Sequence, residues 1–192
     1  MKRISTKDLT KMALLAALLC VSAYINIPLG FTPARLTLQT MIINLTAILL
    51  TPGQSFLTVL VYVLIGFAGV PIFSGGEGGP AKLFGPTGGY IMAFLAAAPA
   101  MSFTKMYFEK LVRKVVSNET RARLIAYSVN AIVVGMIIVY LIGTIYMKLM
   151  LGRTWAQVLL MAVVPFIPLD IVKCILAAVI GVPLKKTLDH MK

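Results

Sequence analysis

Long apolar stretches, separated by short polar or basic segments, constrain this chain more than any other feature. A transmembrane helix needs about 20 mostly apolar residues, and six stretches qualify as candidates: 9–27, 36–50, 55–70, 89–103, 124–147 and 156–182. Apolar residues make up 59% of the 192 residues and charged residues 12%, which leaves too few polar side chains to cover a water-soluble globule. The pattern predicts an all-α, polytopic membrane protein, with residues 1–192 forming a single domain of six transmembrane helices.

The distribution of basic residues predicts the orientation of these spans. The net charge is +12, and six spans place both termini on one side of the membrane. Cytoplasmic segments are enriched in Lys and Arg. With the termini inside, thirteen basic residues are cytoplasmic: Lys2, Arg3, Lys7, Lys11, Lys105, Lys110, Arg113, Lys114, Arg121, Arg123, Lys185, Lys186 and Lys192. The outer loops contain only four: Arg35, Lys82, Lys148 and Arg153. We therefore expect both termini in the cytoplasm, a long basic inner loop at 105–123, and contacts with anionic lipid rather than with nucleic acid.

The second outer loop, at 71–88, is unusually rich in glycine. It reads Pro-Ile-Phe-Ser-Gly-Gly-Glu-Gly-Gly from Pro71 and continues as Gly-Pro-Thr-Gly-Gly-Tyr up to Tyr90. Glycine permits left-handed backbone and close approach to a ligand. A flexible surface loop is one interpretation, but we favour a folded lid or binding wall, in which Phe73 and Tyr90 supply apolar surface. The candidate residues here are Phe73, Gly75, Gly76, Glu77, Gly78, Gly79, Gly85, Pro86, Thr87, Gly89 and Tyr90.

Two opposite charges, Asp170 and Lys173, lie inside the last apolar stretch. Their spacing of three places them on one face of a helix, and charges at bilayer depth are costly and usually functional. The pair is interpreted either as a buried salt bridge that fixes helix packing or, as we favour, as a polar ligand site. Pro165 and Pro168 precede it, which predicts a helix that starts or kinks beside a cavity.

Other polar and small residues add to this picture. Thr37 and Gln39 offer hydrogen-bonding groups near the outer end of the second span, whereas Arg35 is expected to be solvated. Ala13 and Ala17 are four residues apart, and small residues at this spacing let another helix pack closely. That helix belongs either to this bundle or to a separate membrane partner.

Several classes of site have no signature in the sequence. We find no nucleophile paired with a histidine, no metal-ligand spacing, no pair of carboxylates for acid–base work and no nucleotide-binding motif. Such groups are what an enzyme would require. We therefore expect no enzymatic activity, no cofactor and no metal, and any ATP hydrolysis must come from other chains.

Four stretches resemble the BioY family, the biotin-specific substrate-binding S-components of energy-coupling factor (ECF) transporters. They are Leu-Thr-Leu-Gln-Thr at 36–40, the Pro71 stretch at 71–79, Gly-Pro-Thr-Gly-Gly-Tyr at 85–90, and Pro-Phe-Ile-Pro-Leu-Asp-Ile-Val-Lys at 165–173. The likeness extends over nearly the whole chain.

The resemblance implies a six-helix S-component in the cell membrane of a prokaryote, with a biotin pocket near the outer face. It implies that Asp170 and Lys173 take part in the ligand site and that Glu77, where an amide is usual, contributes a polar contact. The residue after Gly-Gly-Tyr can be basic in the family and is Ile91 here. Ala13 and Ala17 resemble the motif that docks onto the transmembrane coupling subunit, which works with two ABC-type ATPase subunits.

Two alternatives remain open at this stage. The ligand could be another vitamin, such as thiamine or riboflavin, which a competition panel would separate from biotin. The chain could instead be a solitary proton-coupled vitamin carrier with Asp170 as its proton site, which would transport without any ATPase.

Overall fold

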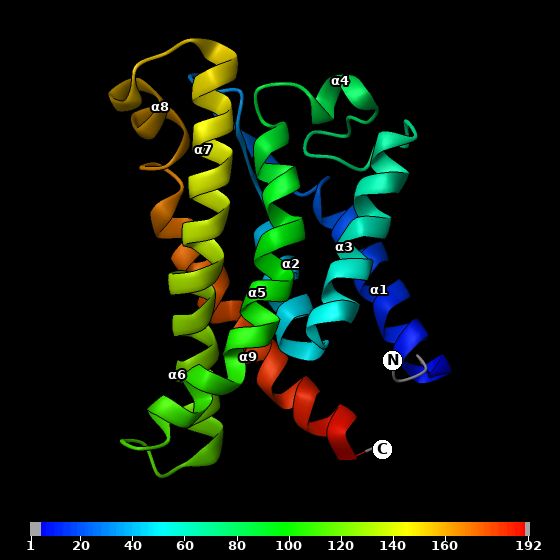
Figure 1. Ribbon diagram of the computed structural model, residues 1–192, viewed down its shortest axis with the longest axis vertical. Coiled ribbons are helices and arrows are strands. Elements are labelled where there is room, and N and C mark those ends of the chain that lie inside the picture. The colour runs from blue at the N-terminus through cyan, green and yellow to red at the C-terminus, as the bar shows by residue number, and fades with distance from the viewer. Residues whose placement is uncertain (1–4, 191–192) are drawn as a thin grey trace.

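The computed structural model describes residues 5–190 and consists of a bundle of helices with one short β-hairpin (Figure 1). The all-α class and the membrane character are confirmed, although the hairpin was not predicted. The elements in chain order are α1 Thr6–Ser22, β1 Asn26–Pro28, β2 Arg35–Thr37, α2 Gln39–Leu49, α3 Pro52–Phe67, α4 Pro80–Leu83, α5 Gly88–Val112, α6 Glu119–Asn130, the π-helical η1 Ala131–Met136, α7 Ile137–Leu151, α8 Trp155–Ala162 and α9 Ile167–His190. Of the predicted inner basic residues, Lys2, Arg3 and Lys192 lie outside the described residues.

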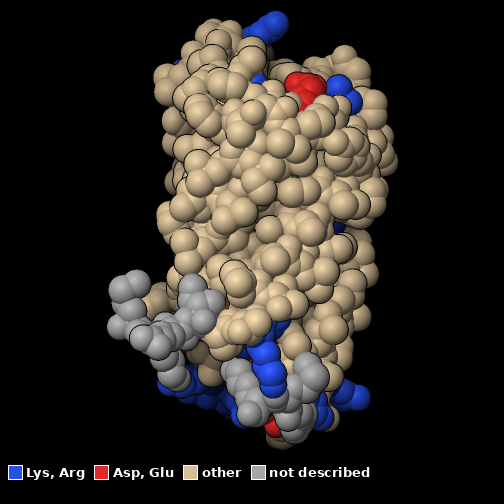
Figure 2. Space-filling model, turned by 90° about the vertical axis from the view of Figure 1, so that its right-hand side faces the viewer, with Lys and Arg blue, Asp and Glu red and all other residues tan. Residues whose placement is uncertain are grey.

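Three helical segments within residues 5–190 are long and apolar enough to cross a membrane: Gly88–Val112, Glu119–Leu151 and Ile167–Asp189. The helices Gln39–Leu49 and Pro52–Phe67 are apolar but shorter, so the number of spans remains a prediction. On the face shown in Figure 2, charged side chains lie mainly at the two ends of the molecule, and an almost uncharged band lies between them. This distribution suits a protein whose middle faces hydrocarbon.

The helix boundaries differ from the predicted ones at both ends of the bundle. The first span ends at Ser22, because the chain then turns into the antiparallel hairpin in which Ile27 pairs with Leu36. The predicted inner loop at 105–123 is mostly helical, since α5 continues to Val112 and α6 begins at Glu119. Ion pairs of 2.8 Å from Glu109 to Arg113 and 3.0 Å from Glu109 to Arg123 satisfy the charges that interrupted the apolar pattern.

The sixth predicted span, 156–182, is not one helix. Helix α8 ends at Ala162, a turn follows, and α9 begins at Ile167. Pro165 lies in this turn, and Pro168 lies in the first turn of α9. Proline has no N–H group for the helical ladder, which explains the break. The kink predicted from the two prolines is therefore confirmed, but the continuous span is wrong.

Helix α5 forms the centre of the bundle and packs against α2, α3, α6 and α7, while α2 also packs against α9. Buried alanines on α5, Ala93, Ala97 and Ala98, allow this close approach on several sides. The first turns of α2, α7 and α9, the beginning of α5 and strand β2 surround a space inside the bundle.

Lys105, a buried residue of α5, fixes the C-terminal end of α2. Its Nζ donates to the backbone carbonyls of Ala47 (2.7 Å), Ile48 (3.0 Å) and Leu50 (2.5 Å). The last carbonyls of a helix lack partners within the helix, and a cation near them is also favoured by the helix dipole. Lys105 therefore ties α5 to the turn that joins α2 and α3.

We expect Lys105→Met to lower the free energy of unfolding by about 2–4 kcal/mol, since the buried carbonyls lose charge-assisted hydrogen bonds. Thermal unfolding in detergent measures this effect. Lys110→Met is the matched control, because Lys110 is exposed on the same helix. Equal melting temperatures for the two variants would contradict the capping role.

Candidate functional site

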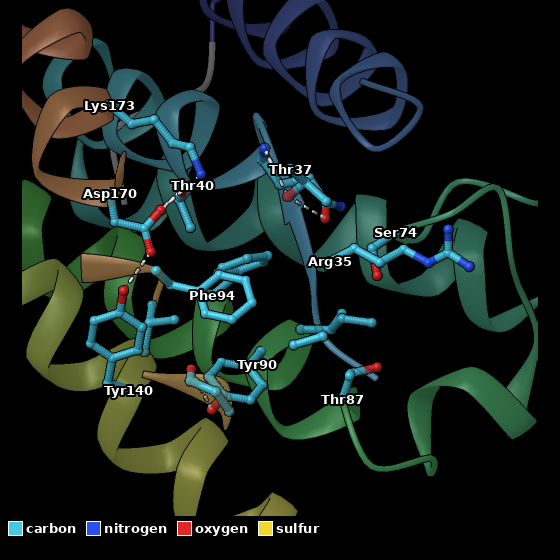
Figure 3. A pocket seen from close by; sticks show the side chains of 16 residues that line it. Arg35, Thr37, Thr40, Ser74, Thr87, Tyr90, Phe94, Tyr140, Asp170 and Lys173 are labelled. Atoms are coloured by element: carbon cyan, nitrogen blue, oxygen red, sulfur yellow. Dashed lines mark hydrogen bonds and ion pairs between the residues drawn. The ribbon is translucent and has the colours of Figure 1, made fainter. Parts of the chain in front are cut away.

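A cavity opens between the first turns of α2, α7 and α9 and the beginning of α5, and it contains about 600 Å³ of empty space, the open mouth included. Figure 3 shows the cavity from close by. It is lined by Ala34, Arg35, Thr37, Gln39, Thr40, Ser74, Thr87, Tyr90, Ile91, Phe94, Val139, Tyr140, Ala162, Phe166, Asp170 and Lys173.

Asp170 is the centre of a polar cluster at one end of this cavity (Figure 3). Its Oδ1 accepts hydrogen bonds from Lys173 Nζ at 2.8 Å and from Thr40 Oγ1 at 3.2 Å, and its Oδ2 accepts one from Tyr140 Oη at 2.6 Å. Asp170 is 6% exposed and Lys173 8%. The carboxylate is thus paired and hydrogen-bonded, which offsets the cost of burying it. The two charges face the interior of the bundle rather than lipid.

Three helices bring this cluster together. Asp170 lies in the first turn of α9, just after the proline break, and Thr40 lies at the outer end of α2. Tyr140 lies on α7, just after the π-helical η1. π-helical segments are frequent at functional sites. A Cβ on Gly135 of η1 would overlap Met101 of α5, so the absence of a side chain lets these two helices approach.

Aromatic and aliphatic side chains form the walls of the cavity. Tyr90 lies between α7 and α8, with its hydroxyl 3.1 Å from Thr144 Oγ1 and 3.4 Å from the carbonyl of Ala162, to which it donates. Its ring lies against Gly143, where a Cβ would overlap it. Phe94 occupies the middle of the cavity in Figure 3. The site therefore combines a polar end with an apolar body.

The structure brings six of the predicted site residues together on the cavity: Thr37, Gln39, Thr87, Tyr90, Asp170 and Lys173. Thr37 Oγ1 donates to Gln39 Oε1 at 3.2 Å, and the Gln39 amide donates to the hydroxyl of Tyr62. Thr87 directly precedes α5, so the Gly-Pro-Thr segment does lead into this helix as predicted.

Phe73 does not line the cavity, contrary to the expected role as an apolar wall. Its side chain is fully buried in the core beneath the loop, with its ring 5.5 Å from that of Tyr62 in an edge-to-face contact. It also lies against Gly66, where there is no room for a Cβ. Burial of a large aromatic ring anchors the loop to α3, whereas the neighbouring Ser74 reaches the cavity.

The glycines of the second outer loop give it a folded shape. Phe73 N–H donates to the Glu77 carbonyl at 2.8 Å, and Gly76 N–H donates to the Phe73 carbonyl at 3.0 Å. Three glycines have positive φ: Gly75, Gly76 and Gly79. A Cβ on Gly78 would overlap the backbone of Val70. The loop needs these glycines for its own conformation, and among the described residues none of them, nor Gly89, which packs against Tyr146, lines the cavity.

Glu77, Gly85 and Pro86 line a second hollow, which we call the outer groove. Its lining residues are Pro33, Arg35, Glu77, Gly78, Ala81, Lys82, Gly85, Pro86 and Thr87. Glu77 forms ion pairs with Lys82 at 3.2 Å and with Arg35 at 3.8 Å. Arg35 is half-buried and lines both hollows, so its side chain is only partly solvated, whereas we expected it to be solvated. The reason is the β-hairpin, which brings Arg35 against the glycine loop.

Sequence reasoning missed Thr40, Ser74, Phe94 and Tyr140 as cavity residues. Thr40 and Tyr140 had a usable signal, since they are hydrogen-bonding groups within apolar stretches. Phe94 had none, because an aromatic residue in an apolar helix does not reveal which neighbour it faces.

Ala13 and Ala17 are exposed on α1, whereas Met12, Leu15, Ala16 and Leu19 of the same helix are buried. The alanine pair therefore faces away from the bundle. Within residues 5–190, no group of three potential metal ligands occurs, and Cys20 and Cys174 are not joined in a disulfide.

The fold matches solved structures of S-components of ECF transporters. The crystal structure of an S-component for biotin from an ECF-type ABC transporter superimposes with a TM-score of 0.79 and 30% identity, covering 94% of this chain and 91% of that one. The S component of a bacterial ECF transporter matches with a TM-score of 0.58 and 19% identity, covering 96% of both chains. At this identity the second match concerns the fold alone.

Known proteins of similar length also match nearly the whole of this chain. The biotin transporter BioY2 of Lactococcus lactis subsp. cremoris is 34% identical over 190 residues, which is 99% of this chain and 96% of the relative. A probable biotin transporter BioY of Pyrococcus horikoshii is 34% identical over 178 residues, or 93% of this chain and 96% of the relative. The model of the BioY family matches residues 1–190. This chain therefore belongs to the BioY family.

Proposed function

We propose that this protein is the biotin-binding S-component of an ECF-type vitamin uptake transporter. The observation that carries the proposal is the buried cluster of Asp170, Lys173, Tyr140 and Thr40 at the end of an otherwise apolar cavity. Biotin joins a compact bicyclic ring with a ureido group to an aliphatic chain with a carboxylate. A cavity with apolar walls and a few fixed polar groups fits such a molecule.

In the proposed complex, the ureido ring lies against the Asp170 cluster. Asp170 accepts hydrogen bonds from the ureido N–H groups, which remain strong because the site is shielded from water. Lys173 and Tyr140, which hold both carboxylate oxygens, keep Asp170 oriented. Tyr90 and Phe94 contact the apolar ring and chain. Glu77 does not line the cavity and acts on the ligand indirectly.

Uptake in this proposal requires other chains. Ala13 and Ala17 on the exposed face of α1 dock against the transmembrane coupling subunit, which two ABC-type ATPase subunits drive. Close packing between membrane helices favours small residues at the contact. We place both termini in the cytoplasm, because the predicted inner side carries most of the basic residues.

The proposal is tested by purifying the protein in detergent and identifying any small molecule that copurifies by its mass. Isothermal titration then measures affinity for biotin, with thiamine and riboflavin as competitors. We expect biotin to be retained and to bind with a dissociation constant well below about 1 μM. A folded sample that binds biotin more weakly than this, or binds a competitor better, would refute biotin as the ligand.

A further inference from the structure

Arg35 lies between the ligand cavity and the outer groove. It is the first residue of β2, and it lines both hollows, as does Thr87. Figure 3 shows its side chain on the opposite side of the cavity from Asp170 and Lys173, with the guanidinium directed away from them. A ligand that reaches from the Asp170 cluster to the mouth of the cavity therefore ends beside Arg35.

The guanidinium of Arg35 is only loosely held. Among residues 5–190 it donates one hydrogen bond, at 3.3 Å, to Asn26 Oδ1. Its ion pair with Glu77 spans 3.8 Å, which is too long for a hydrogen bond. The Lys173–Asp170 pair, by comparison, measures 2.8 Å. Arginine carries five N–H donors, so most of those on Arg35 remain available for another acceptor.

Glu77 has a second ion-pair partner, Lys82, which does not depend on Arg35. Its other carboxylate oxygen lies 3.2 Å from Lys82 Nζ, and its side chain is 49% exposed. Arg35 also lies across Gly75, where a Cβ would fall within 2.7 Å of the Arg35 Nε atom. The glycine loop thus leaves space for the arginine side chain and supplies its weak counter-ion.

The charges along the cavity favour an anionic ligand. Its charged lining residues are Arg35, Asp170 and Lys173. Asp170 and Lys173 neutralise each other at 2.8 Å, which leaves the positive charge of Arg35 at the mouth. Arginine binds carboxylates through two parallel hydrogen bonds, among the strongest polar contacts in proteins.

We propose that Arg35 binds the carboxylate of the ligand, and that Glu77 is the exchangeable partner that Arg35 releases when the ligand enters. This inference rests on the proposed biotin function and adds the residue that distinguishes an acid from its neutral derivative. The polar cluster at Asp170 holds one end of the molecule, and Arg35 holds the other.

Isothermal titration of the full-length protein in detergent, with biotin and with its neutral amide biotinamide, tests this assignment. We expect the wild-type protein to bind biotin at least about tenfold more tightly than biotinamide. In Arg35→Gln this preference should fall to nearly one, with the affinity for biotinamide little changed. Unchanged biotinamide binding also shows that the variant is folded.

Two further variants sharpen the test. Glu77→Gln removes the competing carboxylate and should strengthen biotin binding severalfold without affecting biotinamide. Arg153→Gln is the matched control, since it removes an exposed positive charge from the same side of the molecule and does not line the cavity. It should behave as the wild type.

Each outcome has a defined meaning. Equal weakening of both ligands in Arg35→Gln, or a wild-type protein that does not distinguish them, overturns the role of Arg35 while leaving biotin as the ligand. Weaker biotin binding in Glu77→Gln overturns the exchange. A wild-type protein that binds neither ligand refutes the proposed function, and the Arg35 assignment with it.

Discussion

Replacing Asp170 with asparagine is expected to weaken biotin binding by about a hundredfold, because the ureido N–H groups of biotin lose their charged acceptor. The carboxylate accepts three hydrogen bonds, from Lys173, Thr40 and Tyr140. Hydrogen bonds to a charged group contribute about 1.5–3 kcal/mol each, and the variant also leaves the Lys173 ammonium buried without its counter-ion. Titration with biotin measures the affinity, and thermal unfolding measures the accompanying loss of stability.

A double variant separates a ligand site from a purely structural ion pair. Asp170→Asn combined with Lys173→Met has no unpaired charge, so it should regain most of the melting temperature. If the pair only fixes helix packing, biotin binding returns as well, and our interpretation is wrong. If Asp170 contacts the ligand, binding stays weak although the protein is stable.

The chain contains a matched control for this experiment. Asp8 and Lys11 form an ion pair with the same spacing of three residues and the same distance of 2.8 Å, but at the partly exposed beginning of α1. Exposed pairs contribute about 0–1 kcal/mol. Asp8→Asn with Lys11→Met should therefore change neither stability nor biotin affinity appreciably.

Tryptophan at position 13 or 17 is expected to abolish biotin uptake while leaving biotin binding intact. Both alanines are exposed on α1, so the bundle can accommodate a larger side chain, whereas a close helix–helix contact with a coupling subunit cannot. Uptake of labelled biotin by cells that also produce the coupling and ATPase subunits measures the loss. Binding to the purified variants should stay within about twofold of the wild type.

Leu141→Trp is the control for this prediction. Leu141 is 58% exposed on α7, which lies on the opposite side of the bundle from α1 (Figure 1), and we expect normal uptake. Normal uptake by the Ala13→Trp and Ala17→Trp variants would show that this face of α1 does not dock. Loss of binding in either variant would show that the face supports the ligand site instead.

Local sequence patterns predicted the secondary structure well where apolar residues run without interruption, and less well where charges or prolines intervene. We predicted a loop at Lys105 and Glu109, but both residues lie in α5. Glu109 forms ion pairs with Arg113 and Arg123, and Lys105 donates hydrogen bonds to α2. Pro165 indicated a kink but not its full extent. In these places, contacts with residues distant in the sequence determine where the helices begin and end.

The candidate site was predictable to the extent that its residues were chemically out of place. Asp170 and Lys173 are charges in an apolar stretch, and burial of such charges requires a specific environment. The predictions for Phe73 and Arg35 failed because neither residue type is unusual at its position in the sequence. An aromatic residue is equally suited to a core and to a ligand wall, and an arginine next to an outer loop is usually solvated.

Residue types alone indicate a helical membrane protein with a polar pair inside it, because composition, span length and the cost of buried charge do not depend on how the helices pack. The packed fold, by contrast, brings Tyr140 and Thr40 to Asp170, buries Phe73 in the core and places Arg35 at the mouth of the cavity. These positions depend on how α2, α7, α9 and the β-hairpin pack together. Contacts between distant segments set that packing, and no local pattern encodes them.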